Sequence, residues 1–297
     1  MVRYEILAAA AAVTILAGCR NDIDFDACGQ IDAEQVTVSA EASGRILSLN
    51  VREGDLLNAG QMVGAVDSVQ TTLQIRELEQ RRDGARSRLI DIDRQQAPQK
   101  DQLASLENDF RRYSSLLANN AATQKQVDDL RSQIDILKSQ MAAQKQTWER
   151  NNSSVRSEIS TYEIQIAEKR DQLAKCRICS PVAGTVLTKY ANEGESVTVG
   201  KPLFKLADLT ETYVRAYFTT SQLSTLKLGD EMKVIPDDGS ANPKEYTGRV
   251  IWISSQAEFT PKDIQTRDER AELVYAVKVA VPNDGSLRLG MYAYVRK

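Results

Sequence analysis

The chain has 297 residues, a formal net charge of −3 and no histidine. The missing histidine removes the commonest general base and the commonest metal ligand, and the mildly acidic balance provides no basic surface for nucleic acid. We therefore expect neither a catalytic nor a metal-binding site, in a chain long enough for two or three small domains.

Residues 1–18 have the pattern of a bacterial export signal. Arg3 precedes an apolar run from Ile6 to Ala17, which is too short to span a membrane and is typical of a signal peptide. The run ends in Leu16-Ala17-Gly18-Cys19, which resembles the lipobox of bacterial lipoproteins. The resemblance implies that Cys19 becomes the first mature residue and carries acyl chains that anchor it to a membrane. A plain secretory signal with an incidental cysteine is the alternative.

Residues 19–35 are acidic, with Asp22, Asp24, Asp26 and Asp32. This composition predicts a flexible tether between the lipid anchor and the first domain. The first predicted strand, Val36–Ser39, follows it. These residues do not indicate which of the two membranes holds the anchor.

Residues 36–68 and 176–208 repeat one another at a constant offset of 140 positions. Glycines match in register: Gly44 with Gly184, Gly54 with Gly194, and Gly60 with Gly200. Matched glycines predict matched turns, because glycine adopts backbone angles that other residues avoid. Short β-branched runs between them predict strands (Arg45–Val51, Thr185–Tyr190, Leu203–Leu206). Each copy is too small to bury a core alone, so we expect the two to pair face to face as halves of one β domain.

Residues 69–175, between the two copies, predict a pair of long helices. Apolar residues recur at alternating steps of three and four from Ile75 to Leu117 and again from Val127 to Leu173, which keeps one seam facing a partner helix. A short break near Asn119–Thr123 joins the arms, and therefore an antiparallel hairpin is expected. Arms of roughly 45–50 residues give a rod of about 70 Å, suited to spanning a distance. Two helices of a compact bundle are the alternative.

Three features disturb this seam. Polar side chains lie on it at Arg82, Gln96 and Gln99. Pro98 removes a backbone donor and clashes with the preceding turn, which predicts a kink or break at Gln96–Pro98. Between Asn151 and Ile159 two steps of four follow each other, a stutter that locally unwinds a coiled coil.

Residues 209–297 predict a small closed β-barrel. Short strands bounded by turn residues are expected at Tyr213–Thr219, Met232–Pro236, Tyr246–Ser254, Val274–Val281 and Tyr292–Arg296. Alternation along Val274–Val279 suits a sheet with one buried face, and the number of strands fits a barrel. Thr220 and Ser221 are expected to cap one short helix that ends before Gly229.

Cys176 and Cys179 form a Cys-x-x-Cys pair. Without a second pair or a histidine, two thiols are too few for a structural zinc site. In an extended strand they lie about 10 Å apart, which is beyond disulfide reach. We interpret them as small buried residues, while a disulfide from either one to Cys28 stays open.

Several of these stretches together resemble a known family. Ser43-Gly44-Arg45-Ile46 with Val51-Arg52-Glu53-Gly54-Asp55, and Ser180-Pro181-Val182-Ala183-Gly184-Thr185-Val186 with Asn192-Glu193-Gly194-Glu195, resemble the two lipoyl half-motifs of HlyD-type periplasmic adaptor (membrane fusion) proteins. The resemblance covers essentially the whole mature chain. It implies an α+β fold in which a long α-helical hairpin is inserted in a split lipoyl-like β domain and a small β-barrel follows. The hairpin replaces the turn that carries the modified lysine of a true lipoyl domain, so no lipoyl or biotinyl cofactor is expected.

The resemblance also implies a function without catalysis. The protein would be a periplasmic subunit that joins an inner-membrane exporter to a TolC-like outer-membrane channel and assembles with itself into a ring, a hexamer in the family. At the hairpin tip, Arg112, Leu116 and Thr123 match the Arg-x3-Leu-x6-Ser pattern with which related adaptors contact the channel, with Thr in place of Ser. Leu116 lies beside the seam, so we expect it to be partly exposed, as a docking surface requires.

The segment Phe259–Arg270 resembles a loop of adaptors that serve ABC-type exporters, and no membrane-proximal domain is expected after the barrel. An ABC exporter is therefore predicted, with an MFS or RND pump as the alternative. The chain has no Gly-rich phosphate loop, so the partner pump is expected to supply the energy. Two other functions remain open: a lipid-anchored coiled-coil tether without a transport role, and an enzyme, which the missing histidine disfavours.

Overall fold

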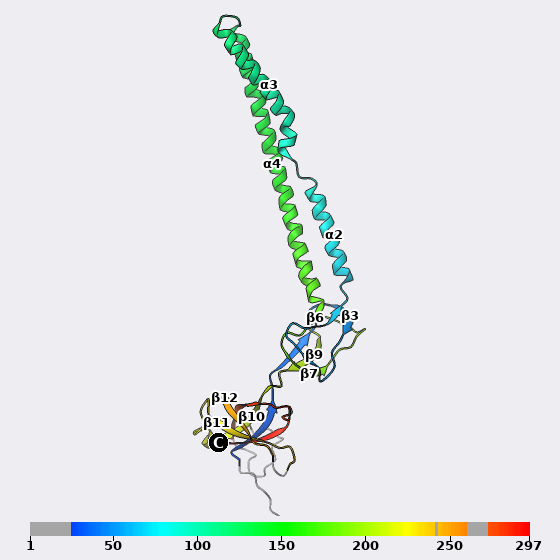
Figure 1. Cartoon of the computed structure of the whole chain (residues 1–297), viewed down its shortest axis with the longest axis vertical. Coiled ribbons are helices and arrows are strands. Elements are labelled where there is room, and N and C mark those ends of the chain that lie inside the picture. Colours follow the sequence, from blue (N-terminus) through cyan, green and yellow to red (C-terminus); the bar gives the residue numbers. More distant parts are fainter. Residues whose placement is uncertain (1–24, 241–242, 260–272) are drawn as a thin grey trace, which may run out of the picture.

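A computed structural model describes residues 25–240, 243–259 and 273–297, which form a long, thin molecule (Figure 1). A helical hairpin forms one end, a β domain built from the two repeat segments lies in the middle, and a β-barrel forms the other end. The predicted α+β fold with an inserted hairpin is confirmed. Cys19, the predicted signal peptide and residues 260–270 lie outside the described residues.

The hairpin consists of α2 (Val69–Arg86), α3 (Ile92–Ala118) and α4 (Gln124–Lys175). α4 is one unbroken helix of 52 residues, which at 1.5 Å per residue is about 78 Å long. α2 and α3 follow each other along α4 and both pack on it (Figure 1). The turn between α3 and α4 lies where the break between the apolar seams predicted it.

The first arm is interrupted at a different place than predicted. The sequence indicated a break at Gln96–Pro98, but the chain leaves the helix at residues 87–91, and Pro98 lies inside α3. Asp91 determines where α3 begins, because its carboxylate accepts a hydrogen bond from the Arg94 amide at 3.2 Å. Pro98 follows in the second turn, where it leaves only the Arg94 carbonyl without its helical donor.

This break lies opposite the predicted stutter in the second arm. Asn152 is only 4% exposed, and its side-chain amide pairs with the main chain at the break. Its Oδ1 accepts from the Ile90 N–H at 2.9 Å, and its Nδ2 donates to the Ile90 carbonyl at 2.7 Å. The heptad pattern placed Asn151 on the seam, whereas the structure buries its neighbour Asn152, because a stutter rotates the contacting face of the helix.

The middle domain contains strands from both repeat segments. The first segment forms β2 (Gln35–Ser39), β3 (Gly44–Leu49), β4 (Leu56–Leu57) and β5 (Met62–Val66), and the second forms β6 (Arg177–Cys179), β7 (Gly184–Lys189), β8 (Ser196–Val197) and β9 (Pro202–Ala207). Two four-stranded sheets result, with the orders β2-β9-β7-β4 and β6-β5-β3-β8. Each sheet mixes strands of both segments. The segments therefore interlock, which is more than the predicted face-to-face pairing.

Main-chain hydrogen bonds in the turns also join the two repeat segments. The Gly54 amide donates to the Val186 carbonyl at 2.8 Å, and the matched Gly194 amide donates to the Ile46 carbonyl at 2.9 Å. Each turn thus closes on a strand of the other segment. Phe204, with no exposed surface, lies in the core that the two sheets share, so neither segment has a core of its own.

The six matched glycines serve two purposes. Gly54, Gly60, Gly194 and Gly200 have φ values from 76° to 92° and lie in turns. Gly44 and Gly184, also predicted as turn residues, instead begin β3 and β7. A Cβ at Gly184 would lie 2.6 Å from the Ala207 carbonyl oxygen, and one at Gly44 would lie 2.8 Å from Val66 Cγ1. These two glycines therefore permit a close approach of neighbouring strands.

The barrel is closed by strands in the order β1-β10-β13-β12-β11-β14. They are β1 (Ala27–Asp32), β10 (Glu211–Thr219), β11 (Glu231–Pro236), β12 (Tyr246–Phe259), β13 (Leu273–Pro282) and β14 (Tyr292–Arg296), with the short helix α5 (Thr220–Leu223) after β10. All strands predicted within residues 209–297 are present, and β12 extends beyond the predicted Ser254. Apolar side chains of every strand meet in one core.

β1 corrects the prediction of a flexible tether at residues 19–35. It pairs with β10 on one side and β14 on the other, so the barrel would not close without it. Ala27, Gly29 and Ile31 face the interior, whereas Gln30 is exposed and Asp32 is half-buried. Two of these three inward residues are small, and acidic residues lie around them, so the alternation of a strand was not recognisable.

Candidate functional site

The turn at the hairpin tip is fixed by its backbone. Asn120 has φ of 57°, and the Ala121 amide donates to the Leu116 carbonyl at 2.8 Å while the Asn120 amide donates to the Leu117 carbonyl at 2.9 Å. These two bonds form a Schellman motif, which satisfies carbonyls at the end of α3. This role of Asn120 was not predicted from the sequence, although asparagine is the residue besides glycine that most often takes this conformation.

Thr123 begins the second arm through a reciprocal cap. Its Oγ1 accepts a hydrogen bond from the Gln126 amide at 3.4 Å, and the Gln126 side chain accepts one from the Thr123 amide at 2.9 Å. The hydroxyl also donates to Gln126 Oε1 at 3.0 Å. This capping box satisfies donors at the start of α4. The hydroxyl that the sequence assigned to channel contact therefore has a task within the hairpin.

Arg112 and Leu116 lie one helical turn apart on α3, close to the tip. The Arg112 guanidinium pairs with the Asp109 carboxylate at 2.7 Å and lies 5.6 Å from the centre of the Tyr113 ring. Leu116 is 38% exposed, as expected. The structure thus brings the three residues of the sequence motif to the same end of the hairpin, with an apolar and a cationic side chain accessible from outside.

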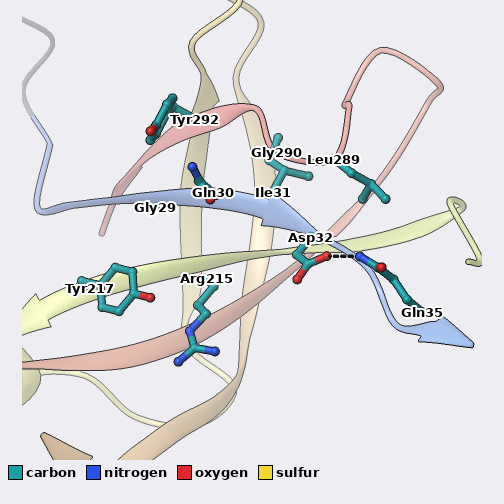
Figure 2. A pocket seen from close by; sticks show the side chains of 10 residues that line it. All are labelled: Gly29, Gln30, Ile31, Asp32, Gln35, Arg215, Tyr217, Leu289, Gly290 and Tyr292. Atoms are coloured by element: carbon teal, nitrogen blue, oxygen red, sulfur yellow. Dashed lines mark hydrogen bonds between the residues drawn. The ribbon is translucent and has the colours of Figure 1, made fainter. Parts of the chain in front are cut away.

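A groove of about 430 Å³ at the barrel, shown in Figure 2, was not predicted. β1, β10 and the approach to β14 line it, and Gln35, the first residue of β2, extends it to the junction with the lipoyl-like domain. Arg215 pairs with both carboxylate oxygens of Glu258 at 2.8 and 2.9 Å. Asp32 accepts a hydrogen bond from the side-chain amide of Gln35 at 3.0 Å. The sequence did not predict this groove, because the residues of β1 were expected to form a tether.

The two charged side chains of this groove, Asp32 and Arg215, each have a partner within the chain, which suits a joint between domains. Asp32 also accepts a hydrogen bond from the Tyr213 hydroxyl at 3.4 Å. Burial, together with the Asp32 carboxylate, raises the pKa of Tyr213 above its usual value, so the phenol stays protonated at neutral pH. Among the described residues, no group of three or more Cys, Asp or Glu side chains is placed to hold a metal ion.

Cys176 and Cys179 lie where the second arm enters the lipoyl-like domain. Cys176 is 5% exposed at the end of α4, and burial raises the pKa of its thiol. Cys179 lies on β6 opposite Met62 and is only half-buried. They form no disulfide in the described part of the chain. Cys28 lies on β1, in a different domain from both.

An elongated chain in which a long helical hairpin interrupts a lipoyl-like domain, with a β-barrel beside it, has the architecture of a periplasmic adaptor. Comparison with known families agrees, because residues 34–209 match the family described as RND MFP, barrel-sandwich hybrid domain. The chain therefore belongs to the membrane fusion proteins, the adaptors of efflux systems, which are structural linkers in the periplasm. In the ranges that the structure describes, no helix has both the length and the apolar character to cross a membrane.

Relatives match along nearly the whole chain. The UPF0194 membrane protein YE2891 of Yersinia enterocolitica is 27% identical, over 100% of this chain and 99% of that protein. MacA from Actinobacillus actinomycetemcomitans is 19% identical with a TM-score of 0.59, covering 93% of this chain and 79% of that one. The membrane fusion protein Spr0693 from Streptococcus pneumoniae R6 is 17% identical with a TM-score of 0.52, covering 91% and 96%. At these identities the two solved structures support the fold alone.

Proposed function

We propose that the protein is the lipid-anchored adaptor of a tripartite efflux system, which links an inner-membrane exporter of the ABC type to a TolC-like outer-membrane channel. One observation carries the proposal: a hairpin whose longer helix, α4, has 52 residues and is about 78 Å long presents an exposed leucine and arginine of α3 at the far end of the molecule from the barrel (Figure 1). A contact surface at the end of a rod suits a protein that reaches a distant partner.

The two ends of the molecule receive different partners in this proposal. The tip, with Arg112, Leu116 and Thr123, contacts the channel, while the barrel end faces the exporter. Acyl chains on Cys19 hold the barrel end at a membrane, which we assign to the inner membrane because the exporter lies there. Two acyl chains give stable anchoring where one chain is marginal. Copies of the protein assemble into a ring, which the family resemblance implies to be a hexamer. This ring forms the continuous passage between exporter and channel.

The ABC class of the exporter rests on the resemblance of Phe259–Arg270 to a loop of ABC-associated adaptors. The matching domain is described for RND adaptors, so the class of pump is a separate question from the adaptor function. Cross-linking of the full chain in cells, followed by purification and mass spectrometry, answers it. An ABC permease among the products is the expected result, and an RND or MFS pump would correct the class but retain the function.

The tip contact is tested with one charge placed on either of two neighbouring residues. Leu116→Asp should abolish cross-linking to the channel but retain the exporter, because a carboxylate cannot enter an apolar contact unpaired. Ser115→Asp is the matched control, since it adds the same charge in the same helical turn of α3 but on a different face. Equal channel recovery from both variants would contradict the tip contact. Recovery of neither exporter nor channel from the unaltered chain would favour a structural tether.

The anchor is tested apart from the partners. Cys19→Ser should release the protein into the periplasmic fraction and prevent incorporation of a labelled fatty acid. Labelling that persists in this variant would place the acyl chain elsewhere, and release without any loss of label would contradict the anchor.

A further inference from the structure

One flank of the outer half of the hairpin carries a groove of about 490 Å³ between α3 and α4. Phe110 and Ile134 form its apolar floor, and Arg111, Arg131, Lys138 and Glu107 surround it. Lys138 pairs with Glu107 at 2.8 Å, and Arg111 donates a hydrogen bond to the Asn108 side chain. Arg131 pairs with no carboxylate of the described residues. The groove therefore offers an apolar floor within a net positive rim.

The opposite flank of the hairpin carries an exposed apolar side chain and an exposed carboxylate at the same level along α4. Ile136 on α4 is 58% exposed, although an isoleucine gains most from burial. It lies two residues from both Ile134 and Lys138, which is about 200° around the helix, so it points away from the groove. Asp129, two turns closer to the tip on the same side, is exposed and pairs with no cation of the described residues.

We propose that Ile136 of one copy of this chain inserts into the Phe110–Ile134 groove of the next copy, with Asp129 of the first beside Arg131 of the second. The proposal rests on the proposed function, since it names the contact by which the hairpins of a ring hold one another. If the rotation axis of the ring is parallel to the hairpins, the same residue of every copy lies at the same level along that axis. Ile136 is two residues, or about 3 Å, from the middle of the groove along α4, so it lies at nearly the level of the neighbouring groove.

The placement of the two surfaces selects a second copy as the occupant. Ile136, the knob, and the groove lie on opposite flanks of one hairpin. Each copy therefore contacts one neighbour through its groove and the other neighbour through its knob. Such a heterologous contact repeats from copy to copy and closes into a ring when the rotation allows it. The unpaired carboxylate on the knob flank matches the unpaired guanidinium on the groove flank, as charge complementarity requires.

Cysteine cross-linking of the full membrane-anchored chain tests the contact. Ile136→Cys combined with Lys138→Cys should give, on mild oxidation, a ladder of covalent multimers, because each copy offers one thiol to each neighbour. The two cysteines cannot bridge within a chain, since they lie on opposite sides of one helix. Each single variant alone should give no such ladder, and mixing the two single variants should give dimers only. The unaltered chain measures the background from native cysteines.

Ile164→Cys combined with Lys138→Cys is the matched control. Ile164 lies on the same helix and is 68% exposed, but it is 26 residues nearer the base. This pair should give no ladder, because the two residues of neighbouring copies are then about 39 Å apart in height. A ladder from this pair would mean that the oxidation traps random collisions, and it would overturn the assignment.

A charge exchange gives a second, independent reading. Arg131→Glu or Asp129→Arg alone should lower the yield of multimers by about tenfold, the effect expected of like charges in contact. Coexpression of the two charge variants should restore the yield, because each contact then joins opposite charges again. If the chain is still cross-linked to the exporter and the channel but the double cysteine variant gives no multimers, this contact is wrong and the adaptor function stands. If the cysteine introduced by Ile136→Cys were instead cross-linked to the outer-membrane channel, position 136 would be a channel contact and the proposed contact between copies would be wrong.

Discussion

The lipoyl-like domain and the helical hairpin are made from adjoining stretches of one chain, yet they are held together in opposite ways. In the lipoyl-like domain every sheet contains strands of both repeat segments, and Phe204 and Leu206 have no exposed surface. In the hairpin only a narrow line of side chains is buried, and that line includes the polar residues Gln96 and Asn152. The domain is stabilised by a shared core, whereas the rod is stabilised locally, one turn at a time.

The loss of one side-chain contact should therefore have different effects in the two regions. A cavity in the shared core removes contacts from both segments, so the whole domain loses free energy of unfolding. A lost contact in the rod lowers the stability of neighbouring turns, because residues far along the rod do not share its partners. Substitutions in the two regions, measured on the full chain, therefore test whether the two kinds of stabilisation differ as described.

The largest effect is expected in the shared core. Phe204→Ala should lower the free energy of unfolding of the lipoyl-like domain by about 3–5 kcal/mol, because it removes a fully buried ring and leaves a cavity. Chemical denaturation followed by circular dichroism measures it. Phe259→Ala, at a position that is 80% exposed, is the control and should change little. A loss confined to one sheet, seen by hydrogen exchange, would contradict the shared core.

Asn152→Ala comes next. It leaves the N–H and carbonyl of Ile90 without their partners, which should cost about 1–3 kcal/mol. Hydrogen exchange should become faster at residues 87–92 and on the facing turns of α4 but stay unchanged at the tip. Asn151→Ala, the exposed neighbour on the same helix, should have no such effect. Faster exchange along the entire rod after Asn152→Ala would show that the hairpin unfolds as one unit.

A smaller effect is expected at the tip. Thr123→Ala removes the side-chain cap of α4 and should lower the stability of its first turns by about 1 kcal/mol. Thr123→Ser keeps the hydroxyl and should preserve it. Amide exchange at Gln126 distinguishes the two. If Thr123→Ser also lost channel cross-linking while exchange stayed slow, the methyl group would have a contact role beyond the cap.

The smallest effect concerns the barrel and low pH. Hydrogen bonds, above all from Lys244, hold the pKa of the Asp284 carboxyl well below its usual value. A lowered folded-state pKa stabilises the barrel above the unfolded pKa of about 3.9, and this contribution disappears as the pH falls through the lower folded value. Asp284→Asn should therefore reduce the difference in barrel stability between pH 6 and pH 3. Trp252 fluorescence in a Trp148→Phe chain measures it, and an unchanged pH difference would contradict the role of Asp284.

Patterns that repeat along the chain made much of this fold predictable. The offset of 140 positions identified the halves of the lipoyl-like domain, and the apolar seams identified both arms and the turn between them. Both signals arise because the same local geometry recurs, so many residues report on one feature. The exposure of Leu116 followed from its place beside the seam, which the structure agrees with.

Features that depend on a single distant partner were missed. β1 has few large apolar residues and joins the barrel only through β10 and β14, which are more than 170 residues away along the chain. The break at residues 87–91 depends on Asn152 from the other arm, and the groove beside Arg215 exists only once β1 is in place. No local pattern encodes such pairings, because each is a contact between two residues that occur once.

The interlocked segments also constrain the order in which the chain folds. Their strands are separated by the hairpin, and closing a flexible loop of that length costs about 4 kcal/mol of entropy. Helices whose contacts begin at the tip can form by local steps and extend toward the base, where the Val66 amide already meets the Cys176 carbonyl at 2.8 Å. Because local contacts form fastest, we expect the rod to form first and to bring the two halves together before their strands pair. The hairpin that extends outward in the folded protein would thus also bring the two repeat segments together during folding.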